Sequence, residues 1–300
     1  MDKLRAMQFF CRAAEAGSFA GAANALDVVP SAVSKAVAAL EEELGFALVN
    51  RSTRGFSLTD EGAAYQDQCR RILRDIEEAE GMGRAAGGLR GTLRIGLHPA
   101  LRAAVLGQLG AFLQEHPALT VETSITNSAA AVVGEGFDFV LHIGPLPDSS
   151  LIAVPVGETA TVVCASPDYL AAHGEPTHPR QLAGHAAIIY ARRDEEPNTR
   201  WTFRRTGESE EVVVRPRTIT RDGVGLVDAA LGGCGIARPF EISARPWITA
   251  GRLRRLLTDW EGDTHAITAV LPSRERIASP KIRASLDHLM TALRPHTPAA

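Results

Sequence analysis

The segment between Pro30 and Gly45 constrains the fold most, because both of its ends are strong helix boundaries. Proline has no backbone N–H and restricts the residue before it, so Pro30 suits the first position of a helix. Glycine is the common residue just past a helix end. On a helical wheel the apolar residues fall on one side, and small, polar, cationic and acidic residues fall opposite. The inward positions are Val33, Val37, Leu40 and Leu44, and the outward ones are Ser31, Lys35, Ala38 and Glu42.

Two shorter helices are expected before this segment and two strands after it. Apolar residues at helical spacing from Leu4 to Ala14 predict the first helix, which ends at "AGS" in 16–18. Ser18 is placed to cap a second helix, "FAGAANAL", which "DVVP" breaks. Beyond Gly45, the stretches "FALVN" and "GFSLT" flank "RSTR" and predict two strands. The order predicts a helix-turn-helix followed by a β-wing.

The exposed face of the 31–44 helix favours contact with DNA. A recognition helix reads the major groove with its N-terminal residues, where this one is small, polar and cationic, and its acidic end is distal. Residues 1–58 hold six Lys or Arg against six Asp or Glu, so any attraction must be local. The alternative is a solvated charged face on an ordinary three-helix unit. The predicted DNA-binding residues are Pro30, Ser31, Ser34 and Lys35 on the helix, with Arg51 and Arg54 at the wing tip.

A fourth, longer helix is expected after the wing. Thr59 can cap it, and Asp60 and Glu61 fall in its first turn, where the helix dipole favours acid. An apolar seam at spacings of 4, 3, 4 and 3 is typical of a helix that pairs with a second copy. The alternative is a helix that packs on its own domain. The seam comprises Tyr65, Cys69, Ile72, Ile76 and Ala79, and "GRAAGGLRG" at 83–91 follows as a linker.

The remaining two thirds of the chain alternate strand and helix signals. Strands are predicted at "TLRIGL", "LTVETSI", "GEGFDFVLHIG", "ATVVCAS", "AAIIYA", "EVVVRPRTI", "GIARPF" and "HAITAVL". Helices are predicted at 100–115, 222–232 and 275–294. Such alternation predicts open α/β sheets with parallel strands. The length exceeds what one small domain needs.

Composition and motifs argue against several other classes of protein. The chain has 300 residues and a formal net charge of −3, so no global basic field indicates nucleic acid. Its 4 cysteines form no CxxC pair, which disfavours zinc and disulfides. No run approaches the ~20 apolar residues of a membrane span, and the first residues lack the apolar core of a signal peptide. We therefore expect a cytoplasmic protein with no metal, cofactor or catalytic residue. In "GGCGIA", nothing near Cys234 suggests a base that would activate its thiol, so it is not expected to be catalytic.

The N-terminal sequence closely resembles LysR-type transcriptional regulators. The resemblance is carried by "FFCRAAEAGSFAGAANALDVVPSAVSKAVAALEEELGFALVNRSTRGFSLTDEGAAY" and, more loosely, by "HP" at 116–117, "GFDFVLHIG", "ASPDYLAAHG" and "GGCGIA". It implies a winged helix-turn-helix at 1–58, a dimerising linker helix at 59–90, and two α/β subdomains of periplasmic-binding-protein type. These subdomains would span 91–161 with 266–294, and 162–265.

The resemblance also implies partners and DNA contacts. The family binds double-stranded promoter DNA, usually as a tetramer built from dimers, and responds to a small-molecule effector held between the subdomains. RNA polymerase is a further candidate partner. By position, Ser31, Ser34 and Lys35 match the recognition-helix contacts, and Arg51 matches the wing contact. Val29 departs from the Ser or Thr common in the family, so Pro30 and Ser31 would have to begin the helix.

Ligands of such α/β folds bind where strand ends meet helix starts, in the cleft between subdomains. The helix near Pro99 is expected to offer free N–H groups to an anion, with His98 and His142 as pH-dependent donors. The alternative for either histidine is a structural imidazole. Where the family often has Ser or Thr, this chain has Ala100, Leu101 and Arg102, which weakens a copied carboxylate site. The predicted effector-binding residues are His98, Pro99, Ala100, Leu101, Thr126, Asn127, His142, Gly144, Asp222 and Gly223.

Two rival functions remain open from the residues alone. One is an α/β small-molecule-binding protein or enzyme whose N-terminal module serves only assembly. The other is an architectural DNA binder with a vestigial cleft. Cys69 is read as a packing residue on the seam, with redox sensing as its alternative.

Overall fold

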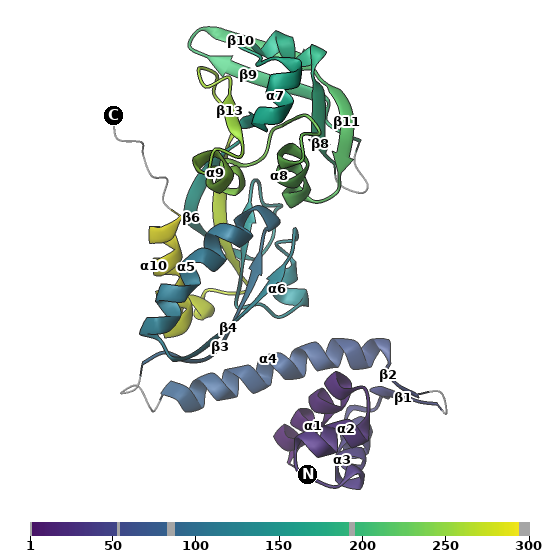
Figure 1. Cartoon of the computed structure of the whole chain (residues 1–300). Helices are drawn as coiled ribbons and strands as arrows, with labels where there is room; N and C mark the ends of the chain where they lie inside the picture. Colours follow the sequence, from purple (N-terminus) through teal and green to yellow (C-terminus); the bar gives the residue numbers. More distant parts are fainter. Residues whose placement is uncertain (1, 53–54, 83–87, 192–195, 294–300) are drawn as a thin grey trace. The chain divides into compact units, whose positions relative to one another are not determined.

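The structure is a computed structural model that describes residues 2–52, 55–82, 88–191 and 196–293 (Figure 1). The chain divides into two compact units. The first comprises Met1–Gly91 with Val133–Gly136, and the second comprises Thr92–Val132 and the chain from Phe137 onward.

The first unit begins with three helices, as the sequence predicts. Helix α1 (Lys3–Ala16) ends at Gly17, whose φ of 61° is left-handed. Ser18 caps α2 (Phe19–Ala25) by accepting from the N–H of Gly21 at 3.0 Å. Helix α3 (Pro30–Leu44) begins without a side-chain cap and ends at Gly45, with a φ of 79°. Its inward residues Val33, Val37 and Leu40 are fully buried.

The wing follows as an antiparallel hairpin of β1 (Val49–Ser52) and β2 (Gly55–Leu58). Phe56 of β2 meets Phe19 edge to face at 5.2 Å, which ties the hairpin to the helices. Thr59 then caps α4 (Asp60–Met82) through the N–H of Gly62 at 2.8 Å. Helix-turn-helix, wing and long helix therefore occur in the predicted order.

The second unit contains two five-stranded sheets, and the first has the strand order β4-β3-β5-β14-β6. Helices α5 (Arg102–Glu115) and α10 (Pro280–Ala292) pack together, and the rings of Phe112 and His288 lie 5.0 Å apart. The short 3₁₀ helix η2 (Pro99–Leu101) precedes α5, and α6 (Ala131–Gly134) follows β4. The strands are β3 (Arg90–Leu97), β4 (Ala118–Ile125), β5 (Phe139–Ile143), β6 (Ile152–Ala160) and β14 (Thr264–Leu271).

The second sheet has the order β11-β8-β12-β7-β13, and a separate hairpin joins β9 to β10. Its strands are β7 (Val163–Ala165), β8 (Ala186–Tyr190), β11 (Arg215–Thr220), β12 (Ile236–Ala237) and β13 (Arg254–Leu256). The hairpin strands are β9 (Arg200–Arg205) and β10 (Glu208–Val213). The helical segments are α7 (Pro167–His173), η3 (Pro179–Gly184), α8 (Gly223–Leu231) and α9 (Glu241–Thr249).

The sheets are mixed, so the expectation of parallel strands is only partly right. β3 and β5 are parallel, as are β8 and β11. β14, however, runs antiparallel to both of its neighbours, β5 and β6. β7 likewise runs antiparallel to β12 and β13. β14 enters the first sheet directly after β13 of the second sheet. No crossover helix has to join it to a parallel neighbour, so it is free to run antiparallel.

Two predicted elements have different bounds. The stretch "EVVVRPRTI" is two strands, because the chain leaves β10 at Val213 and joins β8 of the other sheet as β11. The expected helix over 275–294 is a 3₁₀ turn, η4 (Glu275–Ala278), followed by α10. Pro280 begins α10 because a proline is accepted in the first turn of a helix and is disfavoured further along. In the described part of the chain, no helix is both long and apolar enough to cross a membrane.

Candidate functional site

The exposed start of α3 lies opposite its buried face. Val29 precedes the helix with no capping side chain, and Pro30 occupies the first turn. Ser31 and Lys35 are exposed and Ser34 is half-buried. Lys35 forms no ion pair with any residue that the structure describes. An ammonium group without a partner on a small-residue surface is suited to an anion such as a phosphate.

The wing supplies the second predicted part of this surface. The backbone of Arg51 lies in β1 and pairs with Phe56 across the hairpin. Arg54, the other predicted wing contact, lies outside the described residues.

The acidic end of α3 is more than a tolerated distal charge. Oε1 of Glu41 accepts hydrogen bonds from the backbone N–H of Leu48 at 2.8 Å and of Val49 at 3.1 Å. Glu43 forms an ion pair with Lys3 of α1 at 2.7 Å, and Glu42 is exposed. Two of the three glutamates therefore hold neighbouring elements, which the charge pattern alone did not indicate.

The seam of α4 packs mainly on its own unit in its first half, which corrects the interpretation of the whole seam as a dimer surface. Cys69 is fully buried in a core with Phe10 and Leu48, and Tyr65 packs against the same core. Ile72 is 41% exposed. α1 and the loop before β1 supply the apolar surface that the sequence pattern did not reveal for this helix.

Cys11 of α1 lies beside Cys69, and its thiol lies 4.0 Å from the carbonyl oxygen of Gln66. A hydrogen bond with Cys69, together with burial, raises the pKa of Cys11. Burial also raises the pKa of Tyr65, to about 12. Cys11, Cys69 and Tyr65 therefore pack together between α1 and α4.

The predicted effector residues of the second unit lie at strand ends. His98 follows β3 and Thr126 follows β4, and the parallel strands β3 and β5 end at the same edge. His142 lies near the end of β5 and Gly144 directly follows it, with a φ of 99°. Asn127 is exposed, and Thr126 Oγ1 accepts from the N–H of Ser128 at 3.1 Å.

The expected free N–H groups near Pro99 are occupied within the chain, which corrects that prediction. The ring nitrogen Nδ1 of His98 accepts from the N–H of Ala100 at 3.2 Å, and the His98 carbonyl accepts from Leu101 at 2.9 Å. Pro99, Ala100 and Leu101 are buried. A short 3₁₀ helix caps itself in this way because its few amides find acceptors one turn back.

Near the ends of β3 and β5, aromatic rings from the first sheet meet a ring from the segment that follows β12 of the second sheet. The ring of His98 lies 6.3 Å from that of His142 and 5.7 Å from that of Phe240, centroid to centroid. Phe240, just before α9, also lies 5.2 Å from His265 of β14. The sequence reasoning missed Phe240 and His265, although an aromatic residue just after a strand signal could have suggested the first.

The two predicted residues from the second sheet lie at the start of α8. Asp222 Oδ1 accepts from the N–H of Val224 at 3.0 Å, so its carboxylate caps the helix that begins at Gly223. Helices α8 and α9 both contact η2, which brings these elements to the region of His98. No cluster of His, Cys, Asp or Glu suited to a metal ion occurs among the residues that the structure describes.

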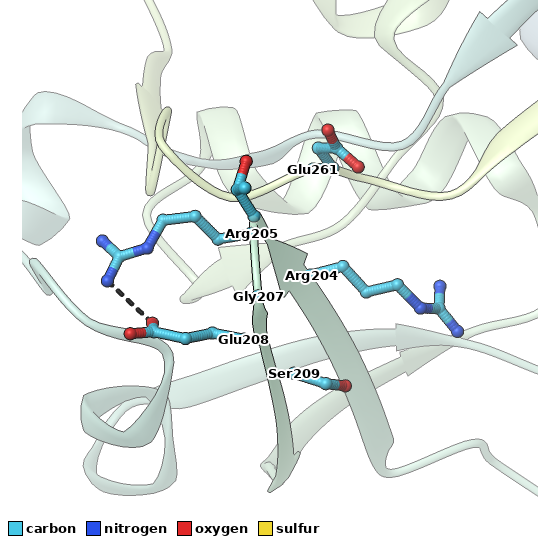
Figure 2. Close-up of a pocket in the computed structure, with 7 residues that line it drawn as sticks. Arg204, Arg205, Gly207, Glu208, Ser209 and Glu261 are labelled. Atoms are coloured by element: carbon cyan, nitrogen blue, oxygen red, sulfur yellow. Dashed lines mark hydrogen bonds and ion pairs between the residues drawn. The ribbon is translucent and has the colours of Figure 1, made fainter.

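A hollow of about 440 Å³ lies elsewhere, at the turn of the β9–β10 hairpin. Figure 2 shows Arg204 and Arg205 pointing away from each other there. Arg205 pairs with Glu208 at 2.7 Å, and Arg204 pairs with Asp263 at 3.3 Å. The hollow includes none of the predicted effector residues, and its cations are neutralised by neighbouring acids.

Cys234 lies exposed in the turn between α8 and β12. A Cβ at Gly235, which has a φ of 151°, would lie 2.3 Å from the carbonyl oxygen of Ala186. The glycine therefore lets β12 lie close against β8, and the turn has a packing role.

Comparisons with known proteins agree with this architecture. The pattern of the LysR substrate binding domain matches residues 86–294, and that of the bacterial regulatory helix-turn-helix protein, lysR family, matches residues 4–63. An HTH-type transcriptional regulator of Xanthomonas campestris pv. campestris (strain 8004) is 35% identical over 288 residues, covering 95% of this chain and 83% of that protein. The HTH-type transcriptional activator AaeR of Escherichia coli (strain K12) is 33% identical over 279 residues, covering 92% and 90%.

Solved structures extend the likeness to three dimensions. The structure of CrgA, a LysR-type transcriptional regulator from Neisseria meningitidis, matches with a TM-score of 0.61 at 30% identity, covering 96% of this chain and 98% of that one. The fold and the matched domains define a transcriptional regulator with a helix-turn-helix DNA-binding domain and an effector-binding domain. The chain belongs to the LysR family.

Proposed function

We propose that this regulator binds promoter DNA through the exposed start of α3 and the wing. Lys35 and Arg51 would contact phosphates, Ser31 and Ser34 would set register in the major groove, and Pro30 and Arg54 would lie at the edges of the contact. The observation that carries the proposal is the exposed Lys35, which has no ion-pair partner among the described residues and lies on a helix whose opposite face is buried. A positive group held on a rigid element needs little reorganisation to meet a phosphate.

We also propose that an effector binds in the second unit, at the edge formed by the ends of β3, β4 and β5 and the start of α8. The boundaries proposed for the functional parts are 1–58, 59–90, 91–161 with 266–294, and 162–265. The proximity of His98, His142 and Phe240 supports the placement, because these rings come from elements of both sheets. An effector that prefers one arrangement of the two sheets would shift the population of states and alter DNA bending. The proposed contact residues are His98, Thr126, Asn127, His142, Gly144, Asp222 and Gly223, whereas Pro99, Ala100 and Leu101 are buried and hold the turn that follows His98.

The working form that we propose is a cytoplasmic homodimer through α4, assembled further into a tetramer, with RNA polymerase as a partner at the promoter. The exposed Ile72 on α4 supports a contact between copies in that part of the helix. We propose no catalytic role, since the relatives are named as transcriptional regulators.

Fluorescence anisotropy tests the central proposal. Purified protein is titrated onto the DNA upstream of its own gene and onto scrambled DNA, across a salt series. Selective binding that weakens steeply with salt is expected, because each phosphate contact releases counterions. Equal, weak binding to both DNAs that vanishes with salt would count against this promoter as the operator and against the DNA contacts proposed here.

A further inference from the structure

Glu41 links the recognition helix directly to the wing. One oxygen, Oε1, accepts from two consecutive backbone amides, those of Leu48 and Val49. Both residues are buried, and Val49 is the first residue of β1. Hydrogen bonds to a carboxylate oxygen are stronger than those to a neutral acceptor, so this contact attaches the wing firmly to α3.

The same segment is held from its other side by the start of α4. Thr59 donates its backbone N–H to the carbonyl oxygen of Leu48 at 3.1 Å and its hydroxyl to that of Ala47 at 2.7 Å. A Cβ at Gly62 would lie 2.0 Å from the Leu48 oxygen, so α4 approaches this backbone as closely as a glycine allows. Residues 47–49 are therefore clamped between α3 and α4.

We propose that Glu41 is a positioning residue for DNA binding, which fixes the wing relative to the recognition helix. The inference rests on the proposed function, in which α3 and the wing contact the same duplex. Arg51 lies two positions beyond Val49 on the same strand, so a shift of the held amides is carried into the wing. Without the carboxylate, Lys35 keeps its place on α3 while the wing contact is lost.

The chain offers a matched control one residue away. Glu42 has the same charge and lies on the same turn of α3, but it is exposed. Glu42→Ala therefore reports the effect of removing a negative charge from the same end of α3, without touching the wing. Glu41→Gln keeps an acceptor oxygen and removes the charge, so it separates hydrogen bonding from electrostatics.

The experiment measures the anisotropy of full-length wild type, Glu41→Ala, Glu41→Gln and Glu42→Ala on the operator across a salt series, with melting temperatures alongside. For Glu41→Ala we expect affinity to fall on the order of tenfold and the salt slope to fall by about one per wing, as for a lost phosphate contact. Glu41→Gln should keep most of the wild-type affinity and most of the wild-type salt slope. Glu42→Ala should keep the wild-type slope and bind at least as tightly.

Hydrogen exchange gives a readout that needs no DNA. The amides of Leu48 and Val49 should exchange faster in Glu41→Ala than in wild type or Glu42→Ala. A wild-type salt slope in Glu41→Ala, or a Glu41→Gln variant as impaired as Glu41→Ala, would overturn the inference while leaving selective wild-type binding intact. Absence of selective binding by the wild type itself would overturn the proposed function, and the inference with it.

Discussion

Lys35 is a single positive charge whose proposed contribution to DNA binding can be tested separately from its effect on the fold. Lys35→Ala removes it from an exposed turn of α3, where no described residue depends on it. We expect weaker operator binding and a salt slope reduced by about 0.9, the value for one phosphate contact. Titrations across a salt series measure both, with Lys35→Arg as the charge-preserving control. An unchanged slope would exclude Lys35 from the phosphate contacts.

Asp138 is a buried charge that holds the second unit together. Its carboxylate is 1% exposed and lies 3.6 Å from Arg276 and 4.0 Å from Lys281, and it accepts from the N–H of Arg94 at 2.8 Å. Asp138→Ala leaves these cations without their buried partner, so we expect a loss of about 3–5 kcal/mol in the free energy of unfolding. Denaturant titration measures it, with the exposed Asp148→Ala as control. A loss no larger than that of the control would contradict the assignment.

At the scale of elements, the junction of wing and α4 depends on the absence of a side chain at Gly62. A Cβ there would meet the Leu48 carbonyl oxygen at 2.0 Å, so Gly62→Ala should destabilise the first unit by about 1–3 kcal/mol. Gly107→Ala in α5 meets open space, and should stabilise by about 0.5–1 kcal/mol. Thermal unfolding distinguishes the two. Equal effects of both variants would show that the close approach at Gly62 does not matter.

We propose that α4 contacts a second copy of the chain around the exposed Ile72. Ile72→Glu places a charge on an exposed apolar position, so we expect a weaker oligomer with little change in melting temperature. Sedimentation velocity at several concentrations measures the shift, and Gln68→Glu on the same helix is the control. An unchanged association constant would remove Ile72 from the interface.

The elements of the first unit were predictable because local signals determine them. Ser18, Pro30, Gly45 and Thr59 each begin or end a helix through their own backbone or side-chain chemistry. The packing of Cys69 was not predictable, since a heptad spacing does not say which neighbour covers it. The same limit applies to β10 and β11. Their shared run of β-formers gives no sign that the chain changes sheets.

Some features of the candidate site were likewise predictable from the sequence, and others were not. The position of Lys35 on an exposed face follows from helical periodicity, and the structure places it there. The capping of Ala100 by His98 and the approach of Phe240 depend on contacts between residues distant in sequence. Glu41 was predictable only in part. Its helix was predicted, but its two amide partners depend on how the wing folds back.

For the whole molecule, the division into two compact units predicts two unfolding transitions. Operator DNA should stabilise only the first unit. At a hundredfold excess over Kd, the free energy of unfolding of that unit should rise by about 2.7 kcal/mol. Asp138→Ala should destabilise only the second unit. Differential scanning calorimetry of the full chain measures both. A single transition moved equally by DNA and by the substitution would contradict independent units.

The chain crosses between the two sheets of the second unit at Thr161 and Asp263, and these residues are hydrogen-bonded neighbours. The N–H of Thr161 donates to the carbonyl oxygen of Asp263 at 2.9 Å, and that of Asp263 donates to Thr161 Oγ1 at 3.2 Å. Residues 162–262 therefore form a lobe whose two ends join the rest of the second unit at adjacent positions, as the ends of an inserted domain do. A graft with junctions at these two residues would exchange the lobe between relatives as a cassette, leaving the host sheet unbroken.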